Sequence, residues 1–312
     1  MKPFENILFV SSEIKGELDA LARAASLARK LGARLTVASV VDRVPSWGAL
    51  LLRQLAAEDL QQAVIDQRRG ELEVLVRAVA EDLDVERRVF VGTPFLEIVR
   101  AVLRDGYDLV AKAGEGPSAR FLGSTDMHLV RKCPVPVWID KPGRHVAYRR
   151  VLAAVDPSPD DPLRDNLDGL ILDHAAEMAA AFAAELHVLH AWSLVGEAAL
   201  TGPFVNMAKE DVATLGRAAR RRAQTELDAL LLRYPPALPG WLAHLLKGSA
   251  ASVIPGFARR RRIDLIVLGT VGRTGLPGFF IGNTAENVLR QVGCSVLAVK
   301  PEGFVSPVTL EA

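Results

Sequence analysis

The sequence predicts an α/β protein made of two similar domains that follow one another along the chain. Three observations lead to this prediction. The chain has 312 residues, a length typical of about two domains. Short apolar segments alternate with longer helical ones, and the same series of segments occurs twice. Half of the residues are hydrophobic and 24% are charged, which is typical of globular domains with sizeable cores.

The repeat consists of five blocks that match in the same order in both halves of the chain. The first pair is Asn6–Ser12 with Arg150–Asp156. The other pairs are Ala33–Val40 with Ala184–Ala191, Val91–Pro94 with Lys247–Ala250, Tyr107–Val110 with Ile263–Ile266, and Gly123–Pro142 with Gly282–Pro301. The small shifts between blocks fall in predicted loops, so the halves are copies of one module. We place the domains at residues 1–143 and 144–312, with a linker near Lys141–Tyr148.

Within each copy, short apolar runs predict buried parallel strands, and the stretches between them predict helices. Strands joined through helices form parallel sheets that are covered on both faces. Each domain is therefore expected to be Rossmann-like, with a mostly parallel five-stranded sheet. The predicted strands are Ile7–Val10, Leu35–Val41, Leu109–Lys112, Val135–Ile139, Val151–Val155, Leu186–Ala191, Leu265–Leu268 and Val296–Val299; the predicted helices are Glu17–Leu31, Gln54–Asp82, His174–Ala184 and Glu210–Tyr234.

Charge and composition exclude several classes of protein. The net charge is +1, so no overall field draws the chain onto nucleic acid, and the runs Arg220–Arg222 and Arg259–Arg262 are predicted to be solvated helix faces. No signal peptide pattern and no apolar stretch of about 18 residues is present, so we expect no membrane span. The two cysteines, Cys133 and Cys294, are predicted to be small apolar fillers in a reducing, cytoplasmic location.

A glycine-rich loop in the second copy is the segment most typical of ligand binding. Gly269, Gly272 and Gly282 follow a buried strand, and a helix is predicted to begin near Asn283. Glycine permits tight turns and close backbone approach, and the free N–H groups of a helix N-terminus favour phosphate. Open parallel sheets bind ligands at the carboxyl ends of their strands, where this loop and Asp156 would lie. A purely structural turn is the alternative.

The loop has the spacing Gly-x2-Gly-x9-Gly, which is neither a Walker A loop nor a dinucleotide motif. This spacing resembles the ATP-binding class of universal stress proteins. The segments Leu268–Gly275, Gly282–Glu286 and Thr125–Pro134 resemble the tandem-domain type of that family. The resemblance implies two adenine nucleotide alpha hydrolase-like domains. It also implies that Val135–Ile139 pairs with Val296–Val299, so that the domains form a pseudo-twofold dimer within one chain.

The resemblance further implies a nucleotide site in the second copy. In the family, an acid after the first strand contacts the nucleoside, backbone at the end of the second strand reads adenine, and the glycine loop holds ribose and phosphates. Nucleotide-binding members usually have Ser or Thr where this chain has Asn283. The expected cofactor is therefore ATP, with or without Mg²⁺, or none. The predicted nucleotide-binding residues are Asp156, Pro157, Ala191, Gly269, Thr270, Gly272, Arg273, Gly282, Asn283 and Thr284. Asp156 has a structural alternative, which is to cap the turn at Pro157–Asp161.

The first copy departs from this pattern. Ser12 stands where the second copy has Asp156, and Ala113 replaces its first glycine. Only six residues separate Gly116 from Gly123, where the second copy has nine. Glu115 brings a negative charge into the same loop. The first copy is therefore predicted to be a scaffold with a degenerate site.

Catalysis is not indicated. Thr125 and Asp126 are typical of a helix N-terminus, and His128 beside them does not make a catalytic cluster. His187 and His190 lie three apart on a predicted strand, so they face opposite sides and cannot share a metal ion. At most, slow ATP hydrolysis would accompany binding.

Two functions remain open. The first is a stress or regulatory protein that senses ATP or AMP through the second copy. The second is an adaptor without nucleotide that holds an apolar or lipid-like ligand. Each function would require a protein partner of unknown identity. The chain is expected to act either as the internal pair of domains alone or as a further homodimer. The apolar residues that support the second function are Phe204, Phe279, Phe280 and Ile281.

Overall fold

The computed structural model describes most of the chain as regular α/β structure. The described residues are 4–12, 17–45, 57–115, 122–141, 147–158, 161–194, 196–201, 205–236, 240–270 and 281–310. The first domain contains β1 (Asn6–Ser11), α1 (Glu17–Leu31), β2 (Arg34–Val41), α3 (Ala57–Ala80), β3 (Val85–Val91), α4 (Pro94–Asp105), β4 (Leu109–Ala113), α5 (Ser124–Lys132) and β5 (Val137–Asp140). The second contains β6 (Arg150–Val155), α6 (Pro162–Phe182), β7 (Glu185–Trp192), α7 (Glu197–Leu200), α8 (Lys209–Arg233), β8 (Leu242–Lys247), α9 (Ala250–Arg261), β9 (Leu265–Gly269), α10 (Asn283–Gln291) and β10 (Ser295–Val299).

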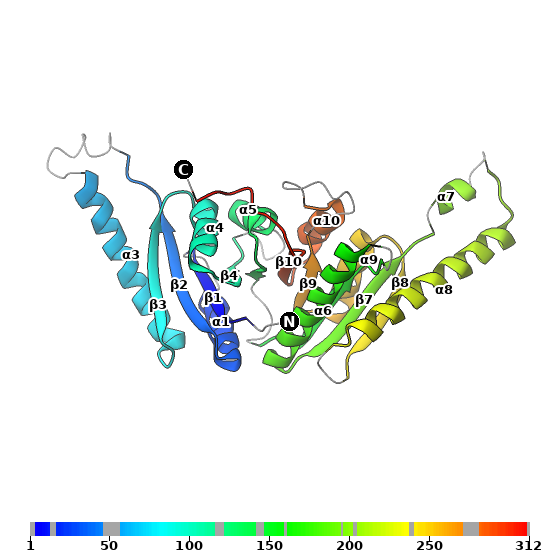
Figure 1. Ribbon diagram of the computed structural model, residues 1–312, viewed down its shortest axis with the longest axis horizontal. Helices are drawn as coiled ribbons and strands as arrows, with labels where there is room; N and C mark the ends of the chain where they lie inside the picture. The colour runs from blue at the N-terminus through cyan, green and yellow to red at the C-terminus, as the bar shows by residue number, and fades with distance from the viewer. Residues whose placement is uncertain are drawn as a thin grey trace.

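The strands form one continuous sheet in the order β3-β2-β1-β4-β5-β10-β9-β6-β7-β8 (Figure 1). Every neighbouring pair within a domain is parallel. The one antiparallel pair, β5 with β10, joins the two domains. The α/β class, the two tandem five-stranded domains and the pairing of their last strands are thus confirmed.

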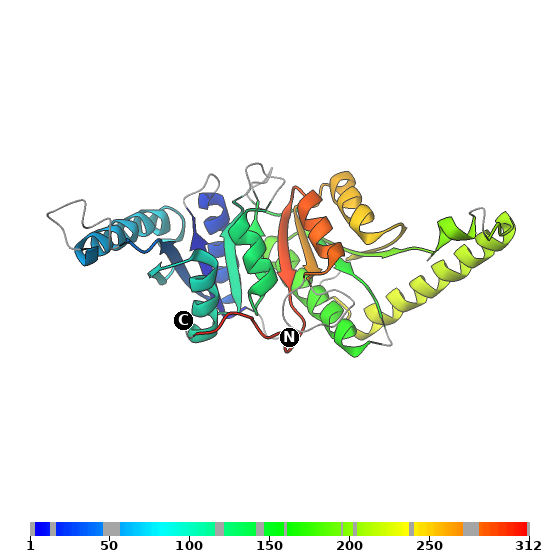
Figure 2. The same ribbon diagram turned by 90° about the horizontal axis from the view of Figure 1, so that it is seen from above.

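Helices cover both faces of this sheet. One apolar layer lies under α1, α3, α6 and α8, and α1 contacts α6 across the domain boundary. The other layer lies under α4, α5, α9 and α10, and Val308 near the C-terminus packs into it. Figure 2 shows α3 and α8 at opposite ends of the elongated molecule. None of the helices in the described ranges is long and apolar enough to cross a membrane.

The structure contains elements that the apolar pattern did not predict, and one helix begins earlier than predicted. Helix α6 begins well before the predicted His174, because Asp161 caps it by accepting a hydrogen bond from the Arg164 amide at 3.4 Å. The edge strands β3 and β8 carry several exposed residues, so they lack the continuous apolar pattern of buried strands. The segment between β7 and α8 contains the short helix α7, which the apolar pattern did not predict.

A buried polar cluster lies beside the β5–β10 pair. Asp140 ends β5 and forms an ion pair with Arg23 of α1 at 2.5 Å, and both side chains are 3% exposed. The Tyr148 hydroxyl also donates to Asp140, and the Ser295 hydroxyl donates to it at 3.0 Å. Trp138 donates its indole N–H to the Tyr148 hydroxyl at 2.9 Å. One carboxylate therefore connects α1, β5, β10 and the segment that leads into the second domain.

Two lysines connect the domains reciprocally. Lys141 Nζ donates to the Val292 carbonyl at the end of α10, at 2.8 Å. Lys300, its counterpart in the repeat, donates to the Val130 carbonyl near the end of α5, at 2.7 Å. The last carbonyls of a helix lack partners within the helix and carry partial negative charge, so each ammonium caps the last helix of the other domain.

The two cysteines behave as apolar fillers. Cys133 is buried, Cys294 is half-buried, and both are free thiols. Burial raises the pKa of each thiol to about 12. Because the thiolate is the reactive form, neither side chain has the character of a reactive cysteine.

Replacing Arg23 by alanine is expected to destabilise the whole protein, because it leaves the Asp140 carboxylate buried without its cation. We expect the free energy of unfolding, measured by urea denaturation, to fall by about 3–5 kcal/mol. The control is Arg77→Ala, which breaks an exposed ion pair with Glu73 and should cost at most about 1 kcal/mol. Equal losses in the two variants would contradict a central role for Asp140.

Candidate functional site

The carboxyl ends of three strands meet in the second domain. β6 pairs in parallel with β7 on one side and with β9 on the other. Asp156 therefore follows β6 close to Ala191 in β7 and Gly269 at the end of β9. The loop after β9 returns to this edge, where the Gly282 amide donates to the Thr270 carbonyl at 2.9 Å. The structure thus brings these predicted site residues to one edge of the sheet.

Helix α10 begins at this edge. Gly282 precedes its first turn, and Asn283 and Thr284 in that turn are exposed. In the part of the chain that the structure describes, no side chain accepts a hydrogen bond from the first amide groups of α10. The positive end of the helix is thus available to an anion. Gly272 and Arg273 lie outside the described residues.

Gly269 has a packing role as well as a place in the site. A Cβ atom at this position would lie 2.7 Å from Leu167 Cδ2 of α6, closer than side chains normally approach. Glycine therefore allows α6 to pack against the end of β9. Both the packing and the loop require the small residue, so the glycine alone does not separate the structural interpretation from the binding one.

Asp156 is half exposed and already has a cation. Its side chain is 51% exposed and forms an ion pair with Arg164 of α6. Pro157 beside it is buried, and Ala191 is half-buried and pairs with Leu246 of β8. The carboxylate thus lies at the predicted edge, but a ribose hydroxyl would share it with a guanidinium.

Asp168 of α6 contacts the backbone of Asp156. The sequence did not indicate this residue. Its Oδ1 accepts a hydrogen bond from the Asp156 amide at 3.0 Å. Within the described structure its buried Oδ2 has no partner, and burial raises the pKa of this carboxyl to about 7. In the first domain Glu17 of α1 accepts from the Ser12 amide at 2.8 Å in the same way. The repeat places Glu17 and Asp168 at matching positions, and this shared acid could have indicated the contact.

Thr270 directly follows β9, and its side chain points away from solvent. Its side chain is fully buried. The hydroxyl accepts a hydrogen bond from Lys300 Nζ at 2.7 Å and lies 3.3 Å from the Val299 carbonyl oxygen. The side chain therefore lies beneath the edge of the sheet, and only the backbone of Thr270 reaches the loop. The hydroxyl of Thr270 therefore joins the end of β9 to Lys300 and the end of β10.

The matching helix of the first domain, α5, carries a carboxylate in its first turn. Asp126 of α5 is fully buried and accepts hydrogen bonds from the amides of Gly123 at 2.8 Å and Glu115 at 3.0 Å. This confirms that Asp126 belongs to a helix N-terminus. Its ion pair with the fully buried Lys112 of β4, at 2.6 Å, was not foreseen. A lysine within an apolar strand was the signal.

The two copies therefore differ in a charged pair. The repeat places Lys112 at the position of Leu268 and Asp126 at the position of Ala285. Both second-domain residues are buried and apolar. A carboxylate of the protein itself occupies the helix N-terminus in the first domain, whereas in the second domain the same position carries a methyl group.

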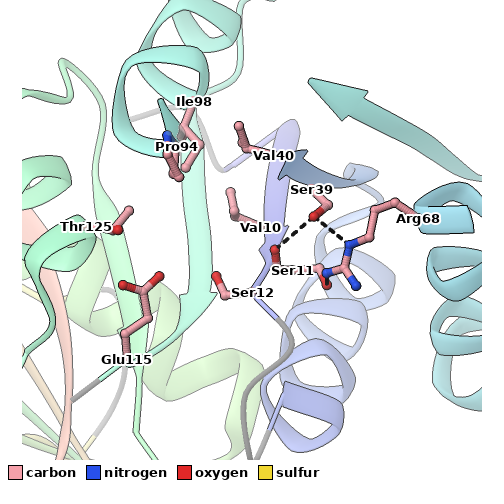
Figure 3. Close-up of a pocket in the computed structure, with 10 residues that line it drawn as sticks. All are labelled: Val10, Ser11, Ser12, Ser39, Val40, Arg68, Pro94, Ile98, Glu115 and Thr125. Atoms are coloured by element: carbon pink, nitrogen blue, oxygen red, sulfur yellow. Dashed lines mark hydrogen bonds between the residues drawn. The ribbon is translucent and has the colours of Figure 1, made fainter. Parts of the chain in front are cut away.

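A pocket of about 200 Å³ opens at the corresponding edge of the first domain (Figure 3). Arg68 of α3 reaches into it and donates to the hydroxyls of Ser39 at 2.7 Å and Ser11 at 2.8 Å. The prediction that the first copy is only a scaffold does not account for this pocket. The lining residues are Val10, Ser11, Ser12, Ser39, Val40, Arg68, Pro94, Ile98, Glu115 and Thr125.

The histidines do not form a metal centre in the described ranges. His187 Nδ1 lies 2.9 Å from His244 Nε2 on the neighbouring strand. His190 points elsewhere, with Nδ1 3.3 Å from the Val155 carbonyl. No group of three or more His, Cys, Asp or Glu side chains that could hold a metal ion occurs among the residues that the structure describes. The opposite orientation of His187 and His190 follows the prediction.

These features define a class of protein: two tandem parallel α/β domains, joined through their last strands, of which the second has a glycine loop and an open helix N-terminus. The profile of the universal stress protein family matches residues 3–141 and 147–300. The chain belongs to the universal stress protein family.

Full-length relatives support this assignment. Universal stress protein E of Escherichia coli (strain K12) is 28% identical over 321 residues, which cover 100% of this chain and 98% of the relative. The crystal structure of a functionally unknown protein from Pseudomonas aeruginosa PAO1 is 26% identical, with a TM-score of 0.71, and the match covers 97% of this chain and 95% of that one. A structure from P. aeruginosa UCBPP-PA14 is 25% identical, with a TM-score of 0.70 and the same coverage.

The charged pair of the first domain can be tested by exchanging it for the residues of the second. Asp126→Ala leaves the Lys112 ammonium buried beside Glu115 alone, and Lys112→Leu leaves two carboxylates without their cation. Each is expected to lower the free energy of unfolding by about 3–5 kcal/mol. In the double variant no isolated buried charge remains at these two positions, so its loss, measured by urea denaturation, should be smaller than the sum of the single losses. Additive losses would contradict the coupling.

Asp168 should make stability depend on pH. Its pKa in the folded state, about 7, lies above the ordinary aspartate pKa of about 3.9. The folded protein therefore holds a proton that the unfolded chain has lost, and this contribution to stability falls as pH rises from about 4 to 7. In Asp168→Asn, stability relative to the wild type should rise by up to about 1.4 kcal/mol per pH unit in this window. Parallel stability curves for the two proteins would contradict this.

Proposed function

We propose that this chain is a stress-response regulatory protein that binds an adenine nucleotide, ATP or AMP, in its second domain. One observation carries the proposal. The start of α10 presents exposed residues after Gly282 and carries no acidic side chain at its third position, where the first turn of α5 carries the buried carboxylate of Asp126. A helix N-terminus at the carboxyl edge of a parallel sheet suits phosphate.

The predicted site residues divide between the two parts of a nucleotide. Gly282, Asn283 and Thr284 would hold phosphate, together with Gly272 and Arg273 of the loop. On the nucleoside side, Asp156 would accept from ribose, and the backbone near Ala191 would read the base. Bound ATP, with or without Mg²⁺, would place negative charge at the positive end of α10. Arg164, which is paired with Asp156, also brings a guanidinium to this edge of the sheet.

We propose regulation and not catalysis because the residues expected at the site are suited to holding a nucleotide. The adaptor alternative rested on apolar side chains near the cleft. Phe204, Phe279 and Phe280 lie outside the described residues. Ile281 is buried in the apolar layer under α9 and α10, so it supports packing. We propose further that the protein acts in the cytoplasm through a protein partner.

Nucleotide should be released when the purified protein is denatured, and it should be detected by its adenine absorbance. Added ATP should raise the melting temperature, because a ligand at about 100 times its Kd adds about 2.7 kcal/mol to the stability of the folded state. The loop variant Gly272→Val should abolish this shift. Failure of ATP and AMP both to co-purify and to stabilise at millimolar concentrations would rule out nucleotide binding in favour of the adaptor function.

A matched pair of charge variants tests where the nucleotide binds. Asn283→Glu and Ser124→Glu each add a carboxylate at the exposed first position of the corresponding helix, α10 or α5. An acid there favours the helix itself, so both variants should fold. Asn283→Glu should weaken ATP binding at least about tenfold, and Ser124→Glu should leave it unchanged. Asn283→Ser, which restores the residue type usual in the family, should strengthen it. An effect of Ser124→Glu alone would place the nucleotide in the first domain.

A further inference from the structure

The pocket of the first domain has a polar floor and an open mouth. Ser11, Ser39 and Arg68 are buried at its floor. Ser12, Glu115 and Thr125 are half-buried at its mouth, so ligands can reach it from solvent. Figure 3 shows the Glu115 carboxylate and the Thr125 hydroxyl on one side and the serine hydroxyls on the other. The pocket is separate from the nucleotide site proposed for the second domain.

The charge around the mouth disfavours an anion. Asp126 places a carboxylate in the first turn of α5 and accepts hydrogen bonds from the amides of Gly123 and Glu115. Lys112 is the cation between two carboxylates, at 2.6 Å from Asp126 and 2.7 Å from Glu115. The guanidinium of Arg68 at the floor is paired with Glu71 at 2.7 Å, so its charge is already balanced. The carboxylates of Asp126, Glu115 and Glu71 therefore exceed the cations Lys112 and Arg68 by one. A phosphate placed beside Glu115 would meet repulsion that a neutral ligand does not.

The remaining polar groups fit a ligand with hydroxyls. A carboxylate accepts hydrogen bonds through two oxygens and can take two neighbouring hydroxyls, as an acidic side chain does with a ribose. Ser11 and Ser39 accept from Arg68, and each serine hydroxyl has a second lone pair. Ser12 and Thr125 add hydroxyls that can donate or accept. The pocket therefore offers partners on both sides for several hydroxyl groups of one ligand.

The size and the apolar wall limit the ligand further. A volume of about 200 Å³ is smaller than typical drug-sized sites of about 300–1,000 Å³. A single sugar ring, alone or with a base that extends through the mouth, suits this space. Val10, Val40, Pro94 and Ile98 form the apolar wall, which can pack against the carbon face of such a ring.

We propose that the pocket of the first domain binds an uncharged small polyol, either a free sugar or the sugar of a nucleoside, and rejects the phosphorylated form. Glu115 receives the hydroxyls at the mouth, and Arg68 orients the serine hydroxyls at the floor. The degenerate copy is thus a second binding site, and Asp126 and Glu115 together set its preference against phosphate.

Isothermal titration calorimetry of the full chain with D-ribose, adenosine and AMP tests this proposal. Thr125→Phe fills the mouth of the pocket. Ser124→Phe, at an exposed neighbouring position that is not among the lining residues, is the control. Ribose or adenosine should bind with millimolar or better affinity, Thr125→Phe should remove this binding, and Ser124→Phe should leave it. AMP should bind to the Thr125-dependent site at least about tenfold more weakly than adenosine. Binding of ribose but not adenosine would identify the ligand as a free sugar. Binding of adenosine but not ribose would identify it as a nucleoside.

Glu115→Gln provides a second measurement that does not fill the pocket. It removes the excess negative charge and keeps the shape of the side chain, so the preference for adenosine over AMP should narrow. The proposal is overturned if neither ribose nor adenosine gives Thr125-dependent binding, if AMP binds this site as tightly as adenosine, or if Glu115→Gln leaves the preference unchanged. None of these outcomes bears on ATP binding that depends on Asn283.

Discussion

The antiparallel pairing of β5 with β10 is the interaction on which both domains depend. Without it, each five-stranded sheet would end in a strand with a free row of backbone donors and acceptors, which favours uncontrolled association. Apolar residues at the centre of the pair are supported by the Asp140 cluster on one side and by Lys141 and Lys300 on the other. These groups come from both halves of the repeat. Each half therefore needs residues of the other half to cover this edge of its core.

The two copies differ in chemistry without differing in fold. Lys112 with Asp126, and Leu268 with Ala285, occupy equivalent positions between a central strand and the last helix. One combination is ionic and closes a helix N-terminus, and the other is apolar and leaves it open. Each pair is internally consistent, because a buried charge is tolerated when its partner is present and costly when it is absent. The exchange of two side chains therefore separates two kinds of binding edge on one scaffold.

The sequence predicted the parts of this structure that depend on local pattern. The bounds of α1, the buried strands, the tandem repeat and the pairing of the last strands all follow from apolar periodicity and from the resemblance between segments. The start of α6 and the edge strands were missed, because polar residues there interrupt the pattern. Asp168, the Lys112–Asp126 pair and the two lysine caps depend on contacts between residues far apart in sequence. Such contacts leave at most one unusual residue as a signal, such as a lysine in an apolar strand.

Joining the two domains in one polypeptide has a consequence for assembly and for evolution. Two separate subunits related by a twofold axis would dissociate on dilution, and any substitution would appear in both. Here the partner is always present at the effective concentration that the linker sets, so the pairing does not vary with the amount of protein in the cell. A substitution such as Ser12 for Asp156 changes one half only, and the other half can keep its original task while the first acquires a new one.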